Sequence, residues 1–401
     1  MNATVTTDFE AEQLRLRKLY KNEPLLEILH LPDSSLWYGG EFHLLYPNAS
    51  QFSSKLSTVC FSNNANAYWK PDESMFPHMR KIALCNSNKL IKPTLENQKQ
   101  VNPNFKQFPV GYDASLSAYE IDDTVRIESI RDGAVTIQRA NYLDQLATNL
   151  HPDETPEGMN STLRQSGIID GRLCPFSAES PFANTIGACA VLIDKHGIPL
   201  LRYRGRADDL PMDVSSQKTR MAVMEKGWHC GASGVVTWQD LLKQPQQPQR
   251  QLIEFDWLLQ GVQNGILREI REETGLLESD GMNIVPLAFA RELKRAGKPN
   301  FFFVVRLVSM SYEDMIQEIL ARSPTGQGEY DLLPDKPGLI TTVKFWLQGQ
   351  KQLTTLRMDP TLTLSNIARS GFQPGQDNLT GFTYENYMAM TLAARWQRNS
   401  A

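Results

Sequence analysis

The sequence lacks the features of secreted, membrane-spanning and nucleic-acid-binding chains. Its five cysteines are scattered and odd in number, without a C-x-x-C pair, which argues against a disulfide framework or a zinc knuckle. No apolar run reaches the roughly 18 residues that a transmembrane helix needs. The formal net charge is only −4, so nothing favours binding to nucleic acid or to an acidic membrane.

The first 21 residues mix acidic and basic side chains and contain no apolar segment. They resemble neither a signal peptide nor a transit peptide, and together with the scattered cysteines they make the cytoplasm the expected compartment. The 401 residues include 41% hydrophobic and 21% charged side chains. This composition predicts a globular protein with two or three domains.

Composition and periodicity divide the chain into four regions. We expect an N-terminal region of unknown role at 1–105, a small β-rich region with a linker at 106–180, an α/β domain at 183–350 and a helical extension at 351–401. The first two regions together make an N-terminal α+β part. The sequence specifies no oligomeric state, and a homodimer is compatible with it.

The N-terminal part contains several local signals. A helical pattern within Thr7–His30 stops around Pro24, and the strands Val125–Ile130 and Ala134–Arg139 flank an Asp-Gly hairpin turn. A short helix is expected at Asn141–Asn149, followed by a Pro-, Gly- and Ser-rich linker at Pro152–Pro181.

The α/β domain begins with a buried strand and alternates between strand and helix patterns. A Gln- and Pro-rich stretch at Lys243–Gln251 precedes its strongest helix, Leu252–Gly275. The other predicted elements are the strands Ile186–Asp194, Ile198–Tyr203, Ile284–Arg291, Asn300–Val308 and Leu339–Leu347, a glycine-bearing loop at Gly227–Gly234, and the helices Ser311–Ala321 and Thr383–Gln397.

Three carboxylates share one face of the helix Leu252–Gly275. Glu269, Glu272 and Glu273 stand at positions i, i+3 and i+4, where like charges repel. A hard divalent cation converts this repulsion into coordination, because Mg²⁺ prefers carboxylate oxygens, water and substrate phosphates. A solvated, charge-laced helix face is the alternative reading of these residues alone.

The nine residues from Arg268 to Leu276 read REIREETGL and match R-E-U-x-E-E-x-G-U, where U is a bulky aliphatic residue. In this string the chain resembles the Nudix hydrolase superfamily, over about 160 residues. The resemblance implies a Nudix-type α/β/α sandwich with a mixed sheet. It implies that Glu269, Glu272 and Glu273 bind Mg²⁺ or Mn²⁺, with Glu273 or Glu272 catalytic and Glu273 ranked first as ligand or base. Arg268 would brace the helix, and Gly275 would end it.

The sequence departs from the family in the first half of the motif, G-x5-E-x7, which would place Gly at 254 and Glu at 260. Those positions hold Glu254 and Gln260. The nearest loop glycine is Gly234, which lies 34 positions before Arg268 where the motif has 14, so its use requires an insertion of about 20 residues. Either Glu254 or Asp240 would then replace the missing glutamate.

A polar turn between two predicted strands offers further candidates. Arg291 and Lys298 could bind phosphate, and Glu292 could act as a base. The alternative is a solvated hairpin without a role in the site.

Two more places fit a substrate site. Glu329, flanked by glycines, is another candidate base, against the alternative of a plain loop. Arg202 and Arg204 alternate on a predicted strand and could face a diphosphate, or they could line a solvent-facing strand edge.

These patterns predict Mg²⁺-dependent hydrolysis of a nucleoside diphosphate linked to another moiety. The expected partner is a nucleotide-type small molecule, with no P-loop, G-x-G-x-x-G or G-x-S-x-G motif to support another chemistry. Two alternatives stay open: a Nudix-like module that binds a nucleotide without turnover, and a scaffold protein whose N-terminal region contacts partners.

Overall fold

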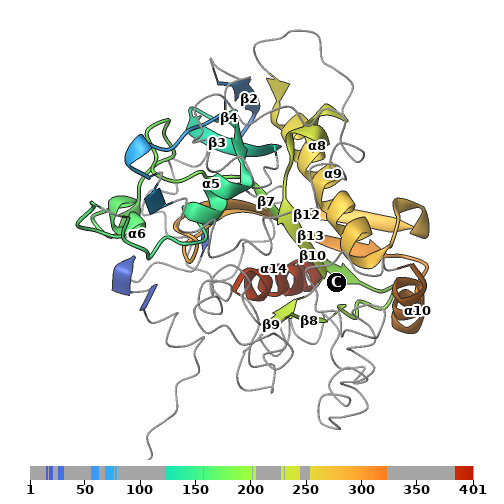
Figure 1. Cartoon of the computed structure of the whole chain (residues 1–401). Helices are drawn as coiled ribbons and strands as arrows, with labels where there is room; N and C mark the ends of the chain where they lie inside the picture. The colour runs from blue at the N-terminus through green and yellow to red at the C-terminus, as the bar shows by residue number, and fades with distance from the viewer. Residues whose placement is uncertain are drawn as a thin grey trace, which may run out of the picture.

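A computed structural model describes thirteen parts of the chain. They are 15–16, 18–20, 26–30, 56–62, 68–75, 77–78, 123–156, 158–200, 202–204, 227–229, 231–243, 253–322 and 384–400. Within them helices and strands alternate and several sheets form, so the chain has mixed α/β content (Figure 1). No helix in these parts is both long and apolar enough to cross a membrane. The domain boundaries stay predictions, and those near residues 105 and 350 lie outside the described parts.

The larger sheet has five strands and mixed direction. Strands β13 and β7 run parallel, and each other neighbouring pair is antiparallel. The continuous apolar runs predicted to form strands do so, because these strands are covered on both faces. In sheet order the strands are β1 (Leu26–His30), β12 (Met282–Glu292), β13 (Lys298–Leu307), β7 (Gly187–Ile193) and β10 (Gly231–Val235).

A second sheet of four strands continues from the first. Its order is β11 (Ile253–Glu254), β2 (Thr58–Phe61), β4 (Ala134–Asn141) and β3 (Asp123–Arg131). The predicted β3–β4 hairpin is confirmed, with positive φ angles at both turn residues, Asp132 and Gly133. Val125 of β3 donates its N–H to the carbonyl of Val236 and accepts from the N–H of Ile186, so the two sheets are joined by hydrogen bonds.

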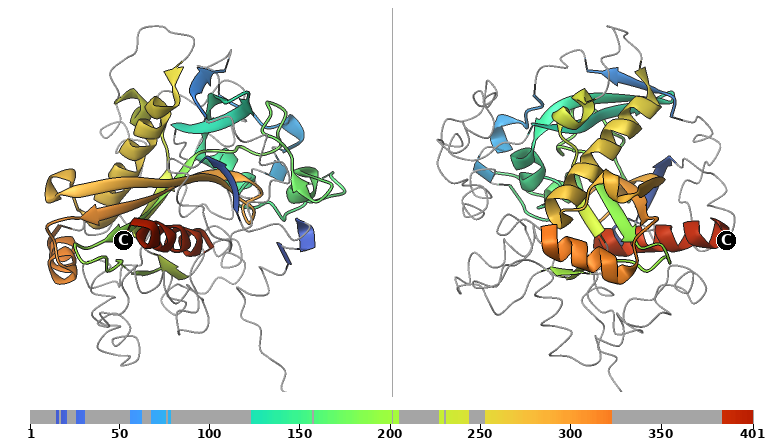
Figure 2. Two further views of the ribbon diagram at one scale, coloured as in Figure 1. Left: turned by 180° about the vertical axis from the view of Figure 1, so that it is seen from behind. Right: turned by 90° about the vertical axis from the view of Figure 1, so that its right-hand side faces the viewer.

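Helices cover both faces of the five-stranded sheet. Helix α9 (Phe255–Thr274) packs on β10 and β7, whereas α14 (Tyr384–Ser400) packs on β7, β12 and β13 from the other side (Figure 2). Both helices were predicted from apolar periodicity, as was α10 (Tyr312–Arg322). The predicted short helix is α5 (Tyr142–Ala147), capped by the Asn141 side chain.

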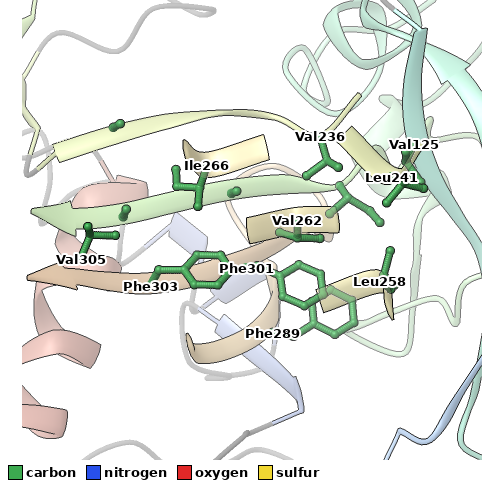
Figure 3. Close-up of a cluster of buried hydrophobic side chains, with 14 of the residues drawn as sticks. Val125, Val236, Leu241, Leu258, Val262, Ile266, Phe289, Phe301, Phe303 and Val305 are labelled. Carbon is green, nitrogen blue, oxygen red and sulfur yellow. The ribbon is translucent and has the colours of Figure 1, made fainter. Parts of the chain in front are cut away.

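The main core lies between the sheet and the inner face of α9. Phe289 and Phe301 stack with their ring centroids 4.2 Å apart (Figure 3). Phe255 from the start of α9 stacks on Phe301. Leu258, Val262, Ile266 and Ile270 from successive turns of α9 are fully buried in the same cluster. This packing fixes the orientation of α9 and therefore the direction in which its polar face points.

Some expectations about local structure are wrong. The segment Gly227–Gly234 is not a loop, because it forms β9 (Gly227–His229) and most of β10. Its glycines permit close approach of other groups rather than a turn. The second strand of the α/β domain is also shorter than expected: β8 (Arg202–Arg204) pairs with β9.

Two expectations about the N-terminal part are also corrected. The predicted linker Pro152–Pro181 contains α6 (Leu163–Ser166) and the paired strands β5 (Ile168–Ile169) and β6 (Arg172–Leu173). The predicted helix within Thr7–His30 is helical at residues 15–16 and 18–19, but its last residues form β1. The predicted strand Leu339–Leu347 lies outside the described residues.

Candidate functional site

Helix α9 carries the candidate carboxylates on its last two turns. Its end is fixed by Gly275, which has a φ of 74° in the left-handed region and returns its N–H to the carbonyl of Arg271. A Cβ on Gly275 would lie 2.7 Å from the backbone of Arg322, at the end of α10. Conformation and close approach together explain why the sequence has glycine here.

Arg268 joins the carboxylates of α9 to the strand and helix that precede it. Its Nη1 donates to Glu269 Oε1 at 2.8 Å and to Glu272 Oε2 at 3.1 Å. Nη2 donates to the carbonyl of Val235 at 2.9 Å and to Asp240 Oδ2 at 3.2 Å, and Nε donates to Asp240 Oδ1 at 3.3 Å. The whole guanidinium edge is therefore engaged, and Arg268 braces α9 against β10 and the segment after it.

Asp240 is almost completely buried, with 1% exposure. It is the third residue of α8 (Trp238–Leu242), where it forms a capping box with Thr237. The Thr237 N–H and hydroxyl both donate to Asp240 Oδ2 at 2.9 Å. Asn264 of α9 donates to the Asp240 carbonyl at 3.0 Å, so side chain and backbone of Asp240 are both held against α9.

Of the two acids considered for the missing glutamate, only Asp240 meets Arg268. Glu254 is exposed at the start of α9, and 14 residues of helix place it about 21 Å from Arg268 along the axis. Asp240 also stands six positions after Gly234, the interval of G-x5-E. The signal for this placement was present in the sequence, because Thr237-x-x-Asp240 is a capping box that starts a helix there.

Glu269 packs directly over Gly234. A Cβ built on Gly234 would collide with the Glu269 carboxylate, so only glycine leaves room for it. Burial raises the pKa of Glu269 to about 7; the nearby charge of Arg268 opposes this shift, while Glu272 and Asp240 add to it. The carboxylate is thus held where negative charge is concentrated and solvent is largely excluded.

The donor chemistry of this cluster fits a hard divalent ion. Glu269, Glu272 and Glu273 offer carboxylate oxygens from one face of α9, and Asp240 adds a fourth negative charge, while Arg268 is the cation that contacts three of these four. Within the described parts of the chain, no three acidic, histidine or cysteine side chains converge as metal ligands. Glu269 and Glu272 instead turn toward the same guanidinium.

Arg291 does not lie near this cluster. Gly234, Ala188, Phe301 and Phe289 are neighbours in register across four strands, so Phe289 is about 14 Å from Gly234. Arg291 lies further along β12 than Phe289.

The contacts of Arg291 are internal to the fold. It pairs with Glu27 of β1 at 3.1 Å and donates to the carbonyl of Cys174 at 2.7 Å. Its guanidinium also lies 4.4 Å from the centroid of the Phe176 ring. Arg291 therefore fastens β1 and the segment after β6 to β12.

Lys298 and Glu292 are buried beneath α14, on the other face of the sheet. Burial lowers the pKa of Lys298, and the charge of Glu292 only partly offsets this. Arg295 bridges Glu292 at 3.5 Å and Glu385 of α14 at 3.1 Å. The solvated-hairpin interpretation is wrong for Lys298 and Glu292, because both residues are buried, with 2% and 1% exposure.

Three candidates cannot be placed against the cluster. Glu329 lies outside the described residues. Arg202 and Arg204 lie on β8, but their side chains lie outside the described part of the structure.

Neither a protein-family model nor a curated protein sequence matches this chain.

Proposed function

We propose that the chain is a Nudix-type, metal-dependent hydrolase that cleaves a phosphoanhydride bond in a nucleoside diphosphate derivative. One observation carries the proposal: Arg268 of REIREETGL is paired with Asp240, which follows Gly234 at the spacing of G-x5-E. The two halves of the motif are separated by an insertion, yet they meet in space. Helices on both faces of a mixed sheet are compatible with the Nudix-type sandwich.

The carboxylates of α9 have distinct roles in this proposal. Glu269, Glu272 and Glu273 would hold the divalent ion, which supplies positive charge opposite the phosphate oxygens. Arg268 orients Glu269 and Glu272 through the hydrogen bonds of its Nη1. Asp240 orients Arg268 in turn, and metal binding would redirect Glu269 and Glu272 from the guanidinium toward the ion.

Proton transfer is assigned to the same helix. Glu273 is half-buried beside Glu269 and Glu272 and accepts the proton of the attacking water. Glu292 belongs to the ion-pair network beneath α14, on the opposite face of the sheet, so we assign it to the fold rather than to catalysis. Glu329 stays a prediction as an additional base.

A panel of diphosphates with Mg²⁺ or Mn²⁺ tests the proposal. The substrates are ADP-ribose, NAD(H), dinucleoside polyphosphates, nucleotide sugars and nucleoside triphosphates, and the readout is phosphate release after phosphatase coupling. We expect metal-dependent turnover of at least one substrate, reduced about 100-fold or more by Glu273→Gln. Glu278→Gln is the matched control, because Glu278 is exposed and lies just beyond α9.

The same panel separates the alternative functions. Binding of one substrate without turnover, at any metal concentration, would replace the hydrolase by a nucleotide-binding module. Turnover that Glu273→Gln leaves unchanged would assign the chemistry to other residues and overturn the site. If no substrate binds, the N-terminal region becomes the place to search for partners.

A further inference from the structure

The outer face of the second sheet contains a polar cavity of about 310 Å³. Cys60, Thr136 and Ser129 form a row across β2, β4 and β3, because Cys60 and Ser129 are both register partners of Thr136. Their strand neighbours Val59, Val135 and Ile130 point to the other face, toward the main core. The cavity is therefore separate from the carboxylates of α9.

A β-bulge directs a carboxylate into this cavity. The register of β3 against β4 shifts between Ile127 and Ser129, so Glu128 is the extra residue. Bulges of this kind re-aim a side chain and recur beside binding sites. Glu128 lines the cavity next to Ser129, although strict alternation would place the two on opposite faces.

One carboxylate oxygen of Glu128 lacks a hydrogen-bond donor within the described parts of the chain, although Arg126 supplies a positive charge nearby. Its Oε2 is buried and accepts no hydrogen bond from the described residues. Arg126 already supplies positive charge nearby, since the charge of Glu128 acts to raise the Arg126 pKa against the lowering effect of burial. The Arg126 nitrogens donate instead to Ala183, Gln138 and Ser177. A buried acceptor without a hydrogen-bond donor in the protein is satisfied by water or by a bound ligand.

The remaining lining matches a neutral ligand with several hydroxyl groups. Ser62 and the hydroxyls of the row both donate and accept, while Glu179 and Arg131 at the rim carry opposite charges. The volume corresponds to about ten water molecules and lies at the lower end of small-molecule sites. A single sugar or cyclitol ring fits within this volume.

We propose that this cavity is a binding site for a small polyhydroxylated ligand, with Glu128 accepting a hydrogen bond from one ligand hydroxyl. Thr136 and Ser129 bind neighbouring hydroxyls. The proposal is independent of the hydrolase activity, because no residue of the site belongs to α9 or to its carboxylate cluster.

Protection of Cys60 provides the test in the full chain. The thiol of Cys60 lines the cavity, whereas Cys174 is free and half-buried elsewhere. Alkylation by iodoacetamide is followed at both cysteines by peptide mass spectrometry, with and without D-glucose, D-ribose or myo-inositol. We expect at least one of these to slow alkylation of Cys60 and to leave Cys174 unchanged.

Two variants test whether Glu128 and Thr136 contact the ligand. Glu128→Gln and the nearly isosteric Thr136→Val should each weaken binding by about tenfold or more, measured by calorimetry on protein with an unchanged melting temperature. Glu313→Gln, at an exposed position of α10, should bind as the unmodified chain does. The proposal is overturned if no polyol protects Cys60, if both variants bind normally, or if spermidine protects where every polyol fails.

Discussion

Substituting Asp240 by Asn tests whether the two separated halves of the motif act as one site. The carboxylate of Asp240 accepts two hydrogen bonds from Arg268 and two from Thr237, at 2.9 to 3.3 Å. Asparagine preserves the size of the side chain and one carbonyl acceptor, but removes the charge. Arg268 would then keep Glu269, Glu272 and the Val235 carbonyl, with at most one neutral acceptor at position 240 in place of two charged ones.

The structure sets the expected magnitude. Leaving a fully buried ion unpaired costs about 3–5 kcal/mol, and a hydrogen bond to a charged group contributes about 1.5–3 kcal/mol. Because Arg268 keeps Glu269 and Glu272, the lower range applies, and we expect Asp240→Asn to lower the free energy of unfolding by about 2 kcal/mol. Loss of orientation of Glu269 and Glu272 should lower kcat/KM about 10- to 100-fold.

Glu254→Gln is the matched control, because Glu254 is the other acid that could have replaced the missing glutamate. It is exposed and makes no side-chain cap at the start of α9, so the change should cost less than about 0.5 kcal/mol. Chemical unfolding and initial rates on the same preparations measure both effects. If Glu254→Gln abolishes turnover while Asp240→Asn leaves it intact, the pairing of the two halves has no role in the reaction.

Two further predictions concern the stability of the fold. Gly275→Ala should lower the free energy of unfolding by about 2–4 kcal/mol, because position 275 has a positive φ and a Cβ there would clash with Arg322. Gly158→Ala is the control for a thermal melt: its φ is 81° but no atom lies within 4 Å of the added Cβ, so this change should cost only about 1 kcal/mol. Burial alone would raise the pKa of Glu385, but Arg295 and other neighbours outweigh it and lower the pKa. The stabilising contribution of Glu385 is therefore present above its unfolded pKa of about 4.3 and is lost as pH falls through the folded pKa. In urea titrations, the difference in unfolding free energy between the unmodified chain and Glu385→Gln should shrink below about pH 4. A difference that grows in acid would contradict this sign.

Elements with strong apolar periodicity could be predicted from the sequence. Helix α9 and the strands β7, β12 and β13 were located correctly because their hydrophobic pattern is local, and the three strands are packed between two apolar clusters. Strand β10 was not predicted, because glycines in a sequence usually indicate a turn. Gly234 instead leaves room for the Glu269 side chain, a contact that depends on how α9 packs across the strand.

The polar residues were harder to assign for the same reason. Arg291 pairs with Glu27 and Lys298 lies near Glu385, partners that are far away in the sequence. When the partner of a basic residue in a turn is unknown, the sequence predicts that the residue is exposed to solvent or binds phosphate. The three glutamates of α9 were different, because their relative positions depend on helix geometry alone.

In the proposed motif, 27 residues separate Asp240 from Arg268 where the family pattern has 7. Lengthening a flexible connection from 7 to 27 residues costs only about 1 kcal/mol in closure entropy. Part of this connection is not flexible: β11 pairs with β2, and the first turns of α9 are buried in the main core. The C-terminal end of the insertion is thereby anchored independently of the ion pair between Arg268 and Asp240. Their ion pair consequently sets the orientation of the carboxylates rather than the existence of the fold, and Asp240→Asn should impair turnover in a protein that still folds.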